Sequence, residues 1–295
     1  MHHNRQLTIT LHNGGRIVLY AATPERNYDL GRMGRLLCLP MDDWKPETMD
    51  AELVSANVMP TGLHTMWKTA LTEIAFTENW SHVLIAGWRR KPKRTVFYRH
   101  YVWQMALIWG TLNALLKGQN AILVHCSALE TESGAVLLFG ESGMGKSTAS
   151  KRWRAQGGKC ISDDMALLDF SGGEQVYVRR MPTWSACREE KNEWNYPAGE
   201  ELPLACVLAL GRSENGRDEI VELSPAQYFA QCYRSMFYWY TYNTKALPDD
   251  MKACLTNRIR TFTERIAGKY PPRALLTVLK ENDLRTVIER HLETL

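Results

Sequence analysis

The sequence lacks the cysteine spacing that a disulfide framework or a zinc site would require. Its seven cysteines are an odd number, and no two of them form a C-x-x-C pair. This pattern favours reduced, independent thiols and predicts a cytoplasmic protein.

Long apolar runs are also missing. The first ten residues, MHHNRQLTIT, contain no apolar core of the kind that a signal peptide needs. The most apolar stretch, 102–116, is short and includes Gln104, Thr111 and Asn113. Because a membrane span needs about 20 apolar residues, a buried helix is expected there and no membrane partner is predicted.

Charge of one sign is not in large excess. The chain has 36 Lys and Arg against 32 Asp and Glu, a formal net charge of +4. A basic run, RRKPKRT at 89–95, is interpreted as a solvated loop, with contact to a phosphate or an acidic partner as the alternative. No helix-turn-helix or zinc pattern accompanies it, so no nucleic-acid partner is predicted.

The N-terminal third is predicted to be a small α+β domain, residues 1–98, that could bind a substrate peptide. A hairpin is expected because two β-rich runs, 7–11 and 16–20, flank the turn sequence HNGG. Further predictions are strands at 51–58 and 82–88 and a helix at 64–75.

Residues 99–295 are predicted to form a larger α/β domain, whose sheet is not purely parallel because two adjacent runs precede the glycine-rich stretch. A helix from the glycine-rich stretch to about 156 is expected to stop at Gly157-Gly158. The other expected helices are 100–117, 224–237, 248–267 and 281–293, and the expected strands are 121–130, 134–140, 159–170, 175–180 and 202–210.

The sequence GESGMGKS at 140–147 fits the pattern G-x-x-x-x-G-K-[ST] without a mismatch. Glycines let backbone N–H groups turn inward around phosphate oxygens, and the following helix presents its positive N-terminus to the same anion. Lys146 can reach the β and γ phosphates, and the Ser147 hydroxyl can bind Mg²⁺. We therefore predict a site for ATP, or another nucleoside triphosphate, with Mg²⁺. Its nucleotide-binding residues are Gly140, Glu141, Ser142, Gly143, Met144, Gly145, Lys146, Ser147 and Thr148.

Such a site usually includes a carboxylate at the end of a strand, and two candidates follow the loop. One is the pair Asp163-Asp164 after KCIS, and the other is Asp169, which closes MALLD. Adjacent carboxylates can divide labour between metal binding and proton transfer. The residues alone leave this choice open.

Residues 121–170 resemble the catalytic domain of the HPr kinase/phosphorylase family, whose core is similar to phosphoenolpyruvate carboxykinases. The resemblance is carried by His125 fifteen residues before Gly140 and by the Asp pair, which begins twenty-three residues after it. It implies a P-loop kinase domain with a mixed sheet. It also implies that Asp163 is the general base, that Asp164 and His125 support it, that Lys146 holds phosphate, and that Ser147 and Asp164 bind the metal.

The stretch 178–203 departs from that family and resembles kinase-related proteins of modified-peptide cassettes. These are the SynChlorMet cassette proteins and the kinases of lasso-peptide precursors. In this stretch Arg179, Arg180 and Trp184 are candidates for substrate contact, with an ordinary surface loop around a buried Trp as the alternative.

The predicted function is a kinase that transfers the γ-phosphoryl group of ATP to a Ser or Thr hydroxyl. The predicted acceptor is a peptide or small protein, specifically the precursor of a ribosomal peptide natural product. One alternative is a nucleotide-binding regulatory protein with slow or no hydrolysis. Another is a kinase of a small hydroxy metabolite such as free serine. No oligomeric state is predicted.

Overall fold

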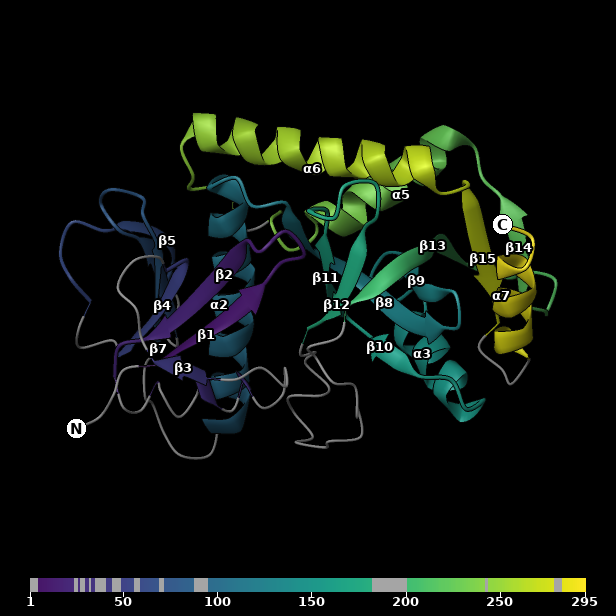
Figure 1. Ribbon diagram of the computed structural model, residues 1–295, viewed down its shortest axis with the longest axis horizontal. Helices are drawn as coiled ribbons and strands as arrows, with labels where there is room; N and C mark the ends of the chain where they lie inside the picture. Colours follow the sequence, from purple (N-terminus) through teal and green to yellow (C-terminus); the bar gives the residue numbers. More distant parts are fainter. Residues whose placement is uncertain are drawn as a thin grey trace. The chain divides into compact units, whose positions relative to one another are not determined.

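The computed structural model divides into two compact units, each built around its own sheet (Figure 1). Unit 1 contains the described residues up to Ile122 together with Tyr240–Leu255, and unit 2 contains the other described residues. The structure describes residues 5–23, 26, 30–31, 33–34, 41–43, 49–55, 59–68, 72–87, 95–181, 201–241, 244–278 and 283–295.

Unit 1 holds a seven-stranded mixed sheet in the order β3-β1-β2-β4-β7-β6-β5. Pairing of β2 with β4 and of β4 with β7 is parallel, and the other pairs are antiparallel. Its strands are β1 (Arg5–Thr10), β2 (Arg16–Ala21), β3 (Met41–Asp43), β4 (Ala51–Ser55), β5 (His64–Lys68), β6 (Thr72–Phe76) and β7 (Val83–Gly87).

The predicted hairpin is confirmed by the antiparallel pairing of β1 and β2. Leu11 and Gly15 close the turn through a backbone hydrogen bond of 2.6 Å, and Gly14 has a φ of 82°. That left-handed conformation is why a glycine stands at the tip. The predicted strands 51–58 and 82–88 are found as β4 and β7, with residues 56–58 and 88 outside the described part.

The helix predicted at 64–75 is wrong, because the described residues of this range form strands β5 and β6. Strand β6 pairs with β5 on one side and β7 on the other, and Ile74 and Phe76 are fully buried. Backbone hydrogen bonds to two neighbours and this burial outweigh the local helical spacing of the apolar residues.

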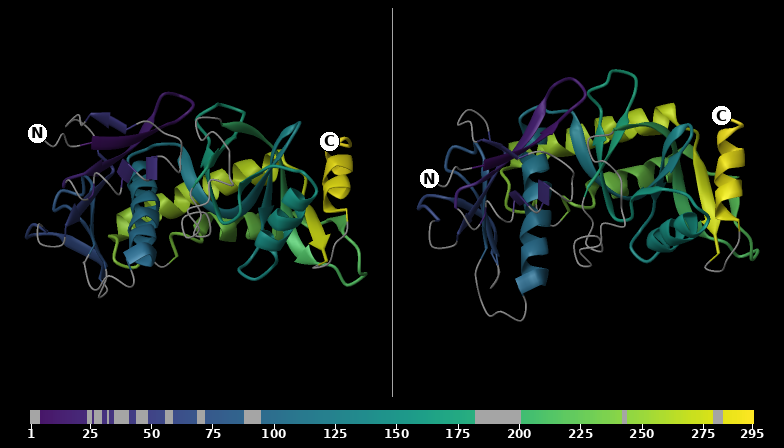
Figure 2. Two further views of the ribbon diagram at one scale, coloured as in Figure 1. Left: turned by 90° about the horizontal axis from the view of Figure 1, so that it is seen from below. Right: turned by 60° about the horizontal axis from the view of Figure 1, so that its bottom comes forward.

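Helix α2 (Thr95–Leu116) packs against β2, β4 and β7 of unit 1 (Figures 1 and 2). This is the helix expected at 100–117, which the sequence places in the second predicted domain, 99–295. Gly110 permits the close approach, since a Cβ there would lie 2.6 Å from the Leu19 side chain. Asn113 donates to the backbone oxygen of Asp50 at 3.1 Å, and the Lys117 ammonium lies 3.1 Å from the Asp50 carboxylate. No helix in the described part of the chain combines the length and apolar character needed to cross a membrane.

Unit 2 holds an eight-stranded sheet, and its mixed character agrees with the prediction from the sequence. Its main path runs β10-β8-β11-β12-β13-β15-β14, and β9 pairs with both β8 and β13. Strand β13 pairs in parallel with β9 and β15, whereas β8 and β9 are antiparallel. The strands are β8 (Ala121–Thr131), β9 (Gly134–Phe139), β10 (Cys160–Ser162), β11 (Met165–Asp169), β12 (Tyr177–Arg180), β13 (Leu202–Arg212), β14 (Glu219–Glu222) and β15 (Arg273–Thr277).

The helices expected in the second half of the chain are all found. They are α3 (Lys146–Ala155), α5 (Pro225–Phe237), α6 (Asp249–Lys269) and α7 (Leu284–Leu292). Ser224 and Gln227 form a reciprocal capping box at the start of α5, with Pro225 in the first turn. The predicted single strand at 159–170 is instead two strands, β10 and β11, separated by Asp163 and Asp164. Strands β14 and β15 were not predicted.

Candidate active site

The glycine-rich loop joins the buried strand β9 to the N-terminus of α3. Gly143 and Gly145 have φ values of 83° and 102°, a left-handed conformation that glycine adopts without steric cost. A Cβ placed on either residue would meet no atom within 4 Å. Open space above a loop of left-handed glycines, at a helix N-terminus, is the geometry that accommodates a phosphate group.

Lys146 is the buried cation of this loop and is only 5% exposed. Its ammonium donates to the backbone oxygens of Gly140 at 2.7 Å and Glu141 at 2.9 Å. Burial lowers the pKa of Lys146 below its usual value, with smaller opposing effects from Cys126, Asp164 and Glu141. Because burial disfavours the charge of the Lys146 ammonium and only two carbonyl groups solvate it, a nearby anion would stabilise the charged form.

The pair Asp163-Asp164 occupies the break between β10 and β11. The Ser162 hydroxyl bonds to the Met165 backbone across this break, accepting from its N–H at 3.2 Å. Cys126 N–H on β8 donates to the backbone oxygen of Asp164 at 3.3 Å. These contacts hold the backbone against β8 and position both carboxylates at the site.

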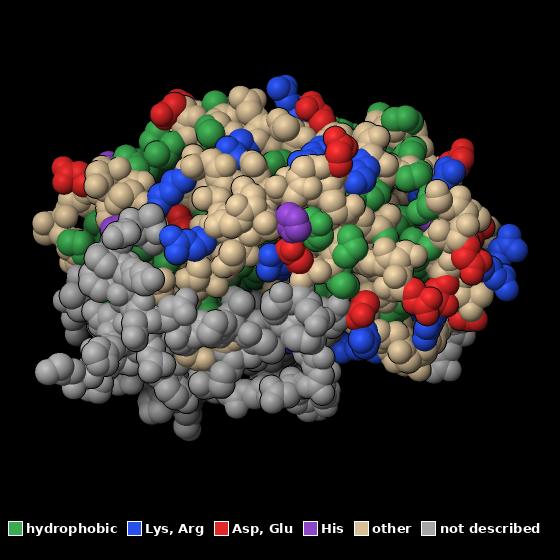
Figure 3. Space-filling view, in the orientation of Figure 1, with side chains coloured by type: hydrophobic (Ala, Val, Ile, Leu, Met, Phe, Trp, Pro, Cys, Tyr) green, Lys and Arg blue, Asp and Glu red, His purple; other side chains and the backbone are tan. Residues whose placement is uncertain are grey.

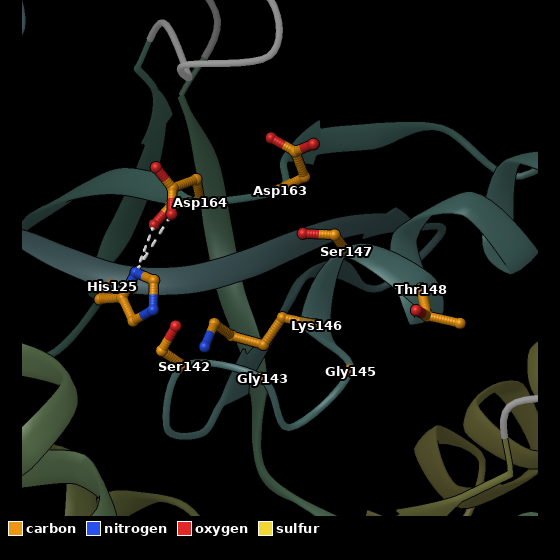
Figure 4. A pocket seen from close by; sticks show the side chains of 9 residues that line it. All are labelled: His125, Ser142, Gly143, Gly145, Lys146, Ser147, Thr148, Asp163 and Asp164. Atoms are coloured by element: carbon orange, nitrogen blue, oxygen red, sulfur yellow. Dashed lines mark hydrogen bonds and ion pairs between the residues drawn. The ribbon is translucent and has the colours of Figure 1, made fainter.

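A cavity of about 260 Å³ brings the predicted groups together (Figure 4). Asp163 and Asp164 lie across the cavity from the loop, and the side chains of Ser147 and Thr148 come from the first turn of α3 (Figure 4). Gly140, Glu141 and Met144 belong to the loop but are not among the lining residues. The lining residues are His125, Ser142, Gly143, Gly145, Lys146, Ser147, Thr148, Asp163 and Asp164.

His125 on β8 contacts Asp164, the second residue of the pair, directly. Its Nδ1 lies 3.0 Å from the backbone oxygen of Asp164 and 3.3 Å from that residue's carboxylate oxygen Oδ1. The imidazole is 6% exposed, and its Nε2 has no hydrogen-bond partner among the described residues. The fold therefore brings His125 into contact with Asp164, and the supporting role of both residues in catalysis stays a prediction.

Asp169, the other candidate carboxylate, lies outside the cavity lining. It is fully buried, its Oδ1 accepts from the Ser171 N–H at 2.9 Å, and the Arg179 guanidinium lies 4.0 Å from its Oδ2. These contacts make Asp169 a structural residue at the end of β11.

Of the three residues proposed for substrate contact, the two that the structure describes, Arg179 and Arg180, are not among those that line the cavity. Arg179 forms an ion pair with Glu201 in addition to its contact with Asp169. Arg180 is buried at the end of β12, and Trp184 lies outside the described residues. Substrate contact by these residues stays a prediction.

The last turn of α5 and the two residues that follow it supply site neighbours that were not predicted. Tyr238 stacks on the His125 ring with centroids 4.1 Å apart, and Trp239 meets the same ring edge-on at 5.6 Å. Arg234 forms an ion pair with Glu141 of the loop at 2.8 Å. The aromatic run FYWY at 237–240 was the available signal, but it contains no pattern tied to phosphate chemistry.

The charged groups of the site are of both signs. On the face of the molecule in Figure 3, acidic and basic side chains of the described residues are interspersed, without a large field of one sign. Within the cavity, one ammonium lies opposite two carboxylates (Figure 4). A magnesium–phosphate group suits this arrangement, since the metal neutralises the carboxylates and Lys146 neutralises phosphate.

Comparison with known proteins gives two similarities. The family described as "SynChlorMet cassette protein ScmC" matches residues 99–270, more than half of the chain. A solved structure of the Hpr(Ser) kinase/phosphatase from Coxiella burnetii is 16% identical to the chain. That similarity covers 35% of this chain and 71% of the other, with a TM-score of 0.25. No curated protein sequence matches the chain.

Proposed function

The chain belongs to the SynChlorMet cassette protein ScmC family, and from this premise we propose that it is an ATP- and Mg²⁺-dependent kinase of a P-loop type. The observation that carries the proposal is the set of groups that meet in the cavity at the start of α3. The cavity joins a buried ammonium, two adjacent carboxylates, a histidine and the hydroxyl of Ser147. A nucleotide-binding loop alone would not require the carboxylate pair and the histidine.

The loop is proposed to hold the phosphates of the nucleotide. The N–H groups at the start of α3 and the open space above Gly143 and Gly145 suit the phosphate oxygens. Lys146 would exchange carbonyl partners for a phosphate oxygen, which offsets the unfavourable burial of its charge.

Ser147 and Asp164 would hold Mg²⁺, because a hydroxyl and a carboxylate are oxygen ligands that this ion prefers. When bound, the metal neutralises charge on the phosphate oxygens. Ser147 is exposed at the cavity, and Asp164 is partly exposed there. His125 fixes the orientation of Asp164 through Nδ1.

Asp163 is proposed as the general base. Its carboxylate accepts the proton of the attacking hydroxyl, whose oxygen forms a bond to the γ-phosphorus of ATP. The bond from that phosphorus to the β–γ bridging oxygen breaks, and ADP leaves with the electron pair. A carboxylate that is 7% exposed suits this task because little water competes for the proton.

The proposed acceptor is a Ser or Thr hydroxyl of a peptide or small protein, specifically a ribosomal peptide natural-product precursor. The cassette family and the sequence resemblance to precursor kinases support this choice. The N-terminal domain, residues 1–98, is the proposed peptide-binding part of the chain. The alternatives are a regulatory protein that binds nucleotide without transfer and a kinase of a small hydroxy metabolite.

The test is incubation of the full chain with Mg²⁺, γ-labelled ATP and Ser- or Thr-containing precursor peptides. Transfer is read as label on the peptide and as the mass increase of one phosphate. Asp163→Asn should lower the transfer rate about 100- to 10,000-fold while leaving the Kd for ATP nearly unchanged. Asp249→Asn is the matched control, because its side chain is 100% exposed and is not among the residues that line the cavity.

Nucleotide binding without label on any acceptor would support the regulatory alternative and contradict the kinase. Label on free serine rather than on peptides would support a metabolite kinase. Full transfer by Asp163→Asn would show that another group accepts the proton.

A further inference from the structure

We propose that Tyr238, together with Trp239, is a positioning residue that holds the His125 imidazole in its working orientation. The proposal rests on the proposed kinase function and adds to it a part of the site that lies outside the loop and the Asp pair. Tyr238 and Trp239 directly follow the last residue of α5, and His125 lies in the middle of β8.

The hydrogen bonds of His125 define which ring nitrogen carries the proton in the neutral ring. Both groups near Nδ1, the backbone oxygen and the carboxylate of Asp164, are acceptors. Nδ1 must therefore donate, which leaves Nε2 as the acceptor nitrogen. Nε2 is buried and has no partner among the described residues. In Figure 4 the nitrogen that does not face Asp164 is turned toward the side where Lys146 and Ser142 lie.

A hydrogen bond at one edge does not by itself fix the plane of an imidazole. Tyr238 covers one face of the ring, with 4.1 Å between centroids and 16° between planes. Trp239 contacts the ring at 90°, and it also meets Tyr238 at 87°. The three rings thus restrict one another, and rotation of His125 would break both aromatic contacts.

The exposure of Tyr238 separates this role from that of an ordinary core residue. Its side chain is 38% exposed, whereas the large aromatic residues that build the core, such as Trp153 and Tyr228, are almost fully buried. A half-open ring stacked on a buried histidine of the site contributes more to the orientation of that histidine than to the stability of the core. Arg234, one turn earlier, contacts Glu141, so this end of α5 reaches the site at two points.

The test compares Tyr238→Ala and Tyr238→Phe with the wild-type full chain. Tyr238→Ala removes the stacked ring and should lower kcat for phosphoryl transfer about 10-fold, with the KM for ATP changed less than about 2-fold. Tyr238→Phe keeps the ring and should restore kcat. Tyr233→Ala is the matched control, since Tyr233 stacks on Phe237 and Phe229 without contacting His125.

A second readout does not depend on the kinase reaction. The ring ¹⁵N signals of His125, assigned with His125→Gln, should show the Nδ1–H form in the wild type and in Tyr238→Phe. Tyr238→Ala should shift them toward a mixture of ring forms. If Tyr238→Ala leaves these signals unchanged, or changes them without lowering kcat, the proposed role is overturned. A shift in KM for ATP with unchanged signals would assign Tyr238 to nucleotide contact instead and also overturn it.

These outcomes are distinguishable from failure of the kinase proposal. If the wild type transfers no phosphate to any acceptor, the kinase fails, while the ring signals still report whether Tyr238 orients His125. Tyr238→Leu provides an apolar substitute without a ring if the alanine variant does not fold.

Discussion

Two cations on the same helix, Lys146 and Arg152, are buried to a similar degree but have different partners. Lys146 is 5% exposed and bonds to two backbone carbonyl groups of its own loop. Arg152 is 8% exposed, and its guanidinium forms a two-point ion pair with Asp218. The same guanidinium donates to the Thr277 hydroxyl at 2.7 Å and to the Val278 backbone oxygen at 2.9 Å. An anion can therefore bind at Lys146 rather than at Arg152, because only Lys146 lacks a carboxylate among its hydrogen-bond partners.

The three carboxylates that follow the loop in the sequence also differ in their partners. Asp163 and Asp164 line the cavity, whereas Asp169 is buried against Ser171 and Arg179. Burial alone does not distinguish a residue that stabilises the fold from one that acts on a ligand. The identity of the partners does, and the following substitutions test this for each residue.

The largest effect is expected from Asp218→Asn, which leaves the buried Arg152 charge without its counter-ion. The free energy of unfolding should fall by about 3–5 kcal/mol, as for other broken buried ion pairs. Chemical denaturation measures it, with the exposed Asp249→Asn as a control that should change it by less than about 0.5 kcal/mol. A loss no larger than that of the control would contradict the structural role of this pair.

Lys146→Ala should have the opposite profile. We expect ATP affinity to fall about 10- to 100-fold, since a charge-assisted contact to phosphate is lost. Stability should change by less than about 1 kcal/mol, because a charge disfavoured by burial is removed. Calorimetric titration measures the affinity, and Lys159→Ala, at a 72% exposed lysine, is the control. Unchanged ATP affinity in Lys146→Ala would contradict the assignment of Lys146 to phosphate binding.

Asp169→Asn tests the carboxylate that remains outside the cavity. Weakening its contacts with Ser171 and Arg179 should cost about 1–2 kcal/mol of stability. The Kd for ATP should stay within about 2-fold of the wild-type value. A loss of phosphoryl transfer as large as that of Asp163→Asn would reverse the assignment of the two carboxylates.

The smallest effect concerns pH. Burial alone would raise the pKa of Asp218, but hydrogen bonds from Arg152, the Val278 backbone and Thr277 outweigh it and lower the pKa below the usual 3.8. Because the pKa of Asp218 is lower in the folded state than in the unfolded state, its carboxylate stabilises the fold at pH values above the unfolded-state pKa. This stabilisation is lost as the pH falls through the folded-state pKa. The stability difference between the wild type and Asp218→Asn should therefore shrink between pH 5 and pH 2. Denaturation curves at several pH values measure it, and a constant difference would contradict the shift.

Predictions from sequence succeeded where neighbours along the chain decide the structure. The turn at 12–15 depends on Gly14, and the start of α5 depends on the reciprocal contacts of Ser224 and Gln227. The prediction of a helix at 64–75 failed because the strand conformation of β6 depends on its pairing with β7, which lies later in the chain. The aromatic contacts of His125 were missed for a similar reason, since Tyr238 lies more than a hundred residues away.

The glycine-rich loop, the helix that follows it and the two candidate carboxylate positions could be predicted from the sequence alone. All of these rest on residue types and spacings within about fifty residues. Only the tertiary structure decided that Asp163 and Asp164 line the cavity while Asp169 is bound by Arg179. It alone paired Arg152 with Asp218, 66 residues away, and left Lys146 facing the cavity. The physical reason is that a buried charge is defined by the groups brought to it, and the fold brings those groups from distant parts of the chain.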